Sequence, residues 1–203
     1  NCGQWLVPDR KNGGVKPGNY VKAAERLYQA AKELDSGFKL FFSADVNGLR
    51  DLPRNMGDMV DRFYDHPNQF RLGDRRVISA WAGRPNTFRS AIDKIKADGR
   101  KVCFVPYLSA RKHAMAWSYE AVLDFFHDQP HMDGIFYFAA DDSANGIIRR
   151  NATARRVTQN LGKIFMAGAA PAYNSPNLRD YRGMYGYAAM WRGIIRDDAD
   201  WVE

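Results

Sequence analysis

The sequence has few cysteines, no long apolar run and none of the short glycine motifs that bind nucleotide phosphates. Two cysteines in 203 residues, Cys2 and Cys103, are too few for a disulfide scaffold or a cysteine-rich zinc site. No apolar stretch approaches the roughly 18 residues of a membrane-spanning helix, and no basic-then-apolar leader opens the chain. Neither a Gly-x-Gly-x-x-Gly fingerprint, nor a Walker motif, nor a Gly-x-Ser-x-Gly elbow is present. We therefore expect no membrane partner, no nucleotide cofactor and no serine-hydrolase chemistry.

The composition is that of a globular protein. Hydrophobic residues make up 45% of the chain and charged residues 26%, which argues against disorder, collagen and coiled coil. A chain of this length can bury a sizeable core, so we expect residues 1–203 to form a single domain.

The charge is unbalanced, with 30 Lys and Arg against 23 Asp and Glu, a net charge of +7. A nucleic-acid surface needs such charges to cluster, usually with stacking aromatics. The densest basic stretch lies in a predicted helix and consists of Arg149, Arg150, Arg155, Arg156 and Lys163. We interpret it as a solvated helix face and expect no nucleic-acid partner; DNA binding by this helix is the weaker hypothesis.

Five apolar runs predict buried β-strands, at residues 38–45, 76–83, 101–108, 132–139 and 163–168. Continuous apolarity is typical of strands that are covered on both faces, as in parallel sheets. Helical periodicity separates the runs, and predicts helices near residues 20–34, 56–63, 88–95, 121–126, 148–161 and 184–195.

The alternation of strands and helices predicts an α/β fold with a parallel sheet and right-handed crossovers. Successive strands begin about 25 to 38 residues apart, as βα units do. Two architectures compete: an open doubly wound sheet and a (β/α)8 barrel, which typically needs about 250 residues.

Candidate site residues follow the predicted strands, because parallel α/β folds form their sites beyond the carboxyl ends of the strands. Carboxylates can bind sugar hydroxyls or move protons, and aromatic faces stack on sugar rings. This pattern predicts a carbohydrate site with Asp45 as the catalytic candidate. The substrate-binding candidates are Trp81, Tyr107, Asp141, Asp142 and Tyr173.

Each candidate also has a purely structural interpretation. Asp45 would cap the following loop, Asp141 and Asp142 would form an Asx turn, Trp81 would be core and Tyr173 a loop anchor. Cys103 lies inside an apolar strand, so we expect a buried, inert thiol. We interpret His113 and His127 as surface or capping residues, His66 as the start of a turn and His131 as a loop residue, and we expect no catalytic metal and no cofactor.

Several of these segments resemble glycoside hydrolase family 71, the α-1,3-glucanases or mutanases. The sequence Phe-Phe-Ser-Ala-Asp at residues 41–45 resembles the "FFSFD" strand of that family. The resemblance continues, in order and spacing, through residues 64–70, 76–83, 104–106, 132–138, 141–143 and 198–203.

The resemblance implies a (β/α)8 barrel that cleaves α-1,3-glucan or a related α-glycan by inversion, with Asp45 matching the family's strand-end aspartate. It implies that the first and last strands are missing from this chain, with residues 2–10 forming the loop after the first. The family's proposed acid/base pair would follow residue 203. We accordingly expect a polysaccharide or oligosaccharide substrate and a secreted, cell-surface or periplasmic location. The alternative is a catalytically incomplete, carbohydrate-binding barrel fragment.

Overall fold

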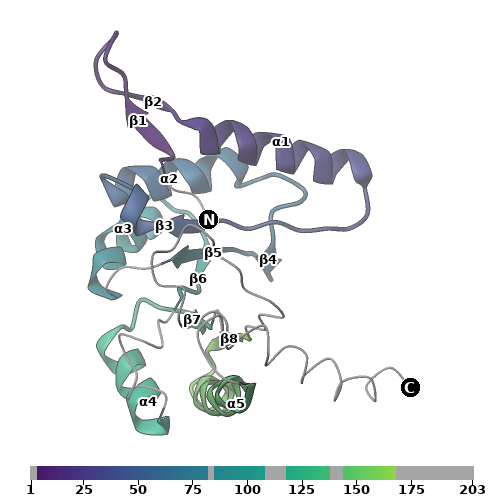
Figure 1. Cartoon of the computed structure of the whole chain (residues 1–203), viewed down its shortest axis with the longest axis vertical. Coiled ribbons are helices and arrows are strands. Elements are labelled where there is room, and N and C mark those ends of the chain that lie inside the picture. The colour runs from purple at the N-terminus through teal and green to yellow at the C-terminus, as the bar shows by residue number, and fades with distance from the viewer. Residues whose placement is uncertain (1–3, 82–84, 108–117, 138–143, 168–203) are drawn as a thin grey trace. The chain divides into compact units, whose positions relative to one another are not determined.

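The structure is a computed structural model that describes residues 4–81, 85–107, 118–137 and 144–167 (Figure 1). The chain divides into two compact units, and the single domain over residues 1–203 stays a prediction. The first contains residues 1–107 and 126–135, and the second contains residues 108–125 and 136–203. Both combine helices with short strands, so the predicted α/β class is confirmed. Among the described residues, no helix is long and apolar enough to cross a membrane.

The first unit opens with a β-hairpin that the apolar runs do not predict. Strand β1 (Leu6–Pro8) pairs antiparallel with β2 (Val15–Pro17), and the hairpin leads into helix α1 (Asn19–Leu34) (Figure 1). The chain returns through Gly13 and Gly14, which both have a φ of 73° and so favour glycine. The prediction of a loop over residues 2–10 was therefore wrong for β1.

Gly18, between the hairpin and α1, is required by a close backbone approach. Its amide donates to the Trp5 carbonyl at 2.7 Å. A Cβ atom at this position would lie 2.1 Å from the carbonyl oxygen of Gln4, far inside van der Waals contact. The start of α1 is thus held directly against the segment that precedes β1.

Three parallel strands form the centre of the first unit: β3 (Ser43–Asp45), β5 (Arg75–Trp81) and β6 (Val102–Phe104). Strand β5 lies between the other two and pairs with both in parallel. The predicted strand at residues 38–45 is shorter than expected, since Leu40 makes only an isolated bridge to Gln69. A further strand, β4 (Arg71–Leu72), was not predicted and pairs antiparallel with β5.

Helices α1, α2 (Leu52–Phe63) and α3 (Pro85–Ala97) match the predicted helices, and each buries an apolar stripe. In α2 the stripe is Met56, Met59, Val60 and Phe63, and in α3 it is Phe88, Ala91, Ile92 and Ile95. Tyr28 of α1 stacks on Phe63 with ring centroids 4.0 Å apart. Leu27 and Leu34, which fit the helical period of α1, are nevertheless 61% and 75% exposed.

Two buried amides fix the segment between α2 and β4. Asn68 donates to the carbonyls of Ala31 and Phe38 at 3.1 and 2.8 Å, which secures the end of α1. Gln69 donates to the Val77 carbonyl at 3.1 Å and accepts a bond from the Tyr28 hydroxyl. These side-chain bonds add to the backbone bonds between Leu40 and residues 68 and 70, which hold the two segments side by side.

Asp133 links the first residue of β5, Arg75, to the last residue of β6, Phe104. Its carboxylate accepts from Arg75 Nη1 at 2.8 Å and from the Phe104 amide at 2.9 Å. The Asp133 side chain is 19% exposed and that of Arg75 is 44% exposed, so solvent screens the ion pair more than the amide bond.

We therefore expect Asp133→Ala to destabilise the protein by about 1–3 kcal/mol, mainly by leaving the buried Phe104 amide without an acceptor. Asp133→Asn keeps an acceptor oxygen and should cost less. Urea denaturation followed by circular dichroism measures both variants. An equal loss in the two would show that the ion pair, and not the amide bond, carries the effect.

The second unit contains helix α5 (Ala144–Asn160) and strand β8 (Ile164–Met166). Strand β7 (Gly134–Phe136) precedes Tyr137, whose amide donates to the Met166 carbonyl at 3.2 Å. Helix α4 (Tyr119–Asp128) precedes β7. Arg149, Arg155 and Arg156 are exposed on α5. The helix predicted at residues 184–195 lies outside the described residues.

Candidate active site

The carboxyl ends of the three parallel strands bring three of the predicted site residues to one edge of the sheet. Asp45 ends β3 and Trp81 ends β5, and the two are register partners across the strand pair. Tyr107 follows β6, and its amide donates to the Ala80 carbonyl at 2.8 Å, which extends the β5–β6 ladder to this edge.

Side-chain alternation places the three on the same face of the sheet. Register partners in parallel strands share a face, and successive residues point to opposite faces. Ala44 and Ala80, which are 1% and 0% exposed, lie on the opposite face. The site face therefore carries Asp45, Trp81 and Tyr107 in a row across β3, β5 and β6.

Trp81 and Tyr107 form a parallel ring stack. Their ring centroids are 4.3 Å apart and the ring planes differ by 7°. Both side chains are half-buried, so Trp81 is not part of the fully buried core. A flat aromatic pair beside a carboxylate is an arrangement that can hold a pyranose ring, with its apolar face on the aromatics and its hydroxyls toward the acid.

The remaining predicted contacts, Asp141, Asp142 and Tyr173, lie outside the described residues. Within the described ranges, no group of three or more His, Cys, Asp or Glu side chains could hold a metal ion. Cys103 is 0% exposed, and burial raises the pKa of its thiol to about 11. The predicted burial of this cysteine is therefore confirmed, and a raised pKa disfavours the thiolate form that a nucleophile needs.

Two serines on the site face were not assigned a role from the sequence. Ser43 and Ser79 lie two residues before Asp45 and Trp81, and they are register partners of each other. The sequence does contain a sign of them: each is a serine inside an apolar run, two residues before a predicted site residue and therefore on the same face of the strand.

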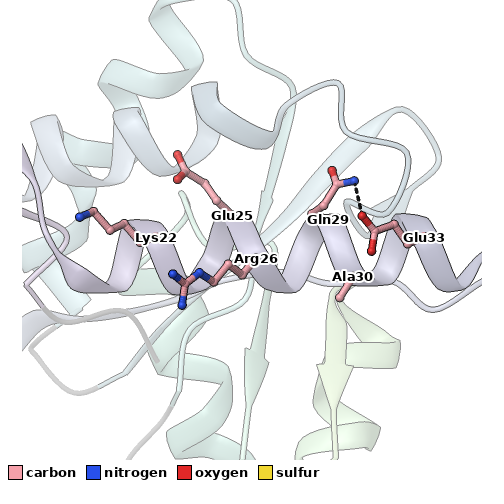
Figure 2. Close-up of a pocket in the computed structure, with 6 residues that line it drawn as sticks. All are labelled: Lys22, Glu25, Arg26, Gln29, Ala30 and Glu33. Carbon is pink, nitrogen blue, oxygen red and sulfur yellow. Dashed lines mark hydrogen bonds between the residues drawn. The ribbon is translucent and has the colours of Figure 1, made fainter.

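A separate surface depression follows the exposed side of α1 (Figure 2). It is lined by Lys22, Glu25, Arg26, Gln29, Ala30 and Glu33, and Gln29 donates to Glu33 at 2.8 Å. All six residues belong to one helix, and their charges are mixed in sign. This depression is a solvated helix face and lies on α1, not at the strand ends that carry the candidate site.

Comparison with known proteins places this chain among the glycoside hydrolases. The profile of Glycosyl hydrolase family 71 matches residues 12–203, which is nearly the whole chain. The chain belongs to glycosyl hydrolase family 71, as its motifs predicted.

Two relatives give this assignment context. The glucan endo-1,3-alpha-glucosidase agn1 of Schizosaccharomyces pombe (strain 972 / ATCC 24843) is 35% identical over 68 residues, 34% of this chain and 16% of that protein. The GH99 endo-alpha-mannosidase from Bacteroides thetaiotaomicron superposes with a TM-score of 0.53 at 17% identity, over 86% of this chain and 54% of that one. At this identity the likeness is one of fold, and the neighbour is TIM-barrel-like. The chain thus spans about half the length of the structural relative and a smaller part of the sequence relative.

Proposed function

We propose that the protein hydrolyses α-1,3-glucan or a related α-glycan with two carboxyl groups, by inversion at the anomeric carbon. The observation that carries the proposal is the row of Asp45, Trp81 and Tyr107 at the carboxyl edge of the sheet in a family 71 chain. The glucanase activity named for the S. pombe relative supports the choice of an α-glucan. The TIM-barrel-like neighbour supports a (β/α)8 barrel to which this chain contributes βα units.

Each residue of the row has a distinct task in the proposal. The Trp81–Tyr107 stack presents apolar rings to the sugar, which orients the ring without a charge. Asp45 accepts hydrogen bonds from sugar hydroxyls or from the attacking water. Inverting glycosidases hold their two carboxyl groups about 6.5–9.5 Å apart, with the water between one of them and the anomeric carbon. Asp141, Asp142 and Tyr173 would complete the sugar contacts.

The test is hydrolysis by the complete polypeptide that the gene encodes. We expect reducing ends from α-1,3-glucan and fewer or none from α-1,4- and β-1,3-glucans. Proton NMR during the first minutes should show the β-anomer as the initial product, because inversion at an α-linkage yields it. Binding of α-1,3-glucan without release of any reducing sugar would overturn hydrolysis and favour a carbohydrate-binding role. An initial α-anomer would overturn inversion alone.

A further inference from the structure

Two buried hydroxyls lie directly below the candidate site. The Oγ atoms of Ser43 and Ser79 are inaccessible to solvent and make no hydrogen bond to any protein group in the part of the chain that the structure describes. The Ser79 residue as a whole is 2% exposed. A buried hydroxyl without a hydrogen-bond partner is destabilising. In native proteins such a hydroxyl almost always has a partner, either a protein group or an ordered water.

The strand geometry shows where this partner must lie. Ser43 and Ser79 are register partners on adjacent parallel strands, and such strands lie about 4.8 Å apart. Both side chains share the sheet face of Asp45, which follows Ser43 by two residues, or about 6.7 Å along the strand. A single group lying over the pair can therefore reach both hydroxyls and the carboxylate above them.

A water molecule fits this position by its chemistry. An ordered buried water makes about three hydrogen bonds, and the two hydroxyls and one carboxylate oxygen supply three. Two bonds of about 2.8 Å meeting at one water reach at most about 5.6 Å, and the length of the Asp45 side chain covers the remaining ~1 Å of the step from Ser43. A carboxylate has about four acceptor sites on its two oxygens, so this bond leaves Asp45 able to bind other groups as well.

We propose that Ser43 and Ser79 are positioning residues that hold one ordered water beneath Asp45, and that this water fixes the orientation of the Asp45 carboxylate for its work on the glycan. The activity readout rests on the proposed function. The presence of the water does not rest on the proposed function, because the water would be bound by the folded protein whether or not it hydrolyses a glycan.

The direct test is a crystal structure of the complete polypeptide at a resolution that shows ordered solvent. We expect density for one water within about 3.2 Å of both serine oxygens and of one Asp45 oxygen. Two hydroxyls bonded to each other, or to a neighbouring side chain, would overturn the proposal. This outcome is independent of catalysis, so it separates failure of the inference from failure of the proposed function.

The kinetic test uses a matched pair of variants. Thr and Val have nearly the same shape, so Ser79→Thr and Ser79→Val disturb packing alike and differ in the hydroxyl. On α-1,3-glucan we expect Ser79→Val to lower kcat about tenfold relative to Ser79→Thr with KM changed less than about twofold, since orientation and not sugar binding is affected. In an Asp45→Asn background the Thr and Val variants should be equal, because the carboxylate they position is gone.

Ser90→Ala, on the exposed side of α3, is the control for a serine hydroxyl away from the site. Equal kcat for the Thr and Val variants would overturn the proposal. A difference confined to KM would show that the hydroxyls bind the sugar directly, and would also overturn it.

Discussion

Asp45→Asn should reduce hydrolysis of α-1,3-glucan by about 10²–10⁴-fold, the range typical of losing a positioned acid or base. Asparagine has the size and shape of aspartate but can neither take a proton nor carry the charge that orients a water. Asp45 lies at the end of β3, half-buried and in register with Trp81. We therefore expect the fold to survive and kcat to fall much more than KM rises.

The measurement compares kcat and KM of the complete polypeptide and its variant, with circular dichroism to verify folding. Asp93→Asn is the matched control, because Asp93 is an exposed carboxylate on α3, 3.7 Å from Arg89. It should keep full activity. Activity of Asp45→Asn within threefold of the parent protein would remove Asp45 from the catalytic machinery and leave it a structural role at the strand end.

The site residues whose positions could be predicted from the sequence are those that follow a clear apolar run. The run at 76–83 predicted β5, and Trp81 at its end follows from the rule that sites form at carboxyl ends. The same rule brought Asp45 and Tyr107 to one edge. That the two aromatic rings stack could not be predicted, because it depends on the register between β5 and β6, which no short-range pattern encodes.

The elements that the sequence did not reveal are short and held by long-range contacts. Strands β1, β2 and β4 have three residues or fewer, too few for an alternation to emerge. The exposure of Leu27 and Leu34 likewise depends on tertiary packing, because their helical spacing alone predicts that they are buried. The buried stripe of α1 is instead Val21, Tyr28 and Ala31, because Tyr28 stacks on Phe63 and its hydroxyl binds Gln69.

Trp5→Ala should be among the most destabilising substitutions in the first unit, at about 3–5 kcal/mol. Trp5 is 0% exposed and packs on Phe42 and Phe63, with ring centroids 6.2 and 6.4 Å away. Its indole Nε1 donates to Asp58 Oδ2 at 2.7 Å. Truncation therefore opens a cavity between the hairpin and α2 and removes a hydrogen bond as well.

Two matched variants separate these contributions. Trp5→Phe retains an aromatic ring but not the donor, and should cost less than Trp5→Ala. Leu27→Ala removes a side chain that is 61% exposed and should change stability by less than about 0.5 kcal/mol. Urea denaturation followed by far-ultraviolet circular dichroism gives all three values. If Trp5→Ala proved no more destabilising than Leu27→Ala, the segment before β1 would not belong to the core, and the close approach of Gly18 to Gln4 would lose its structural purpose.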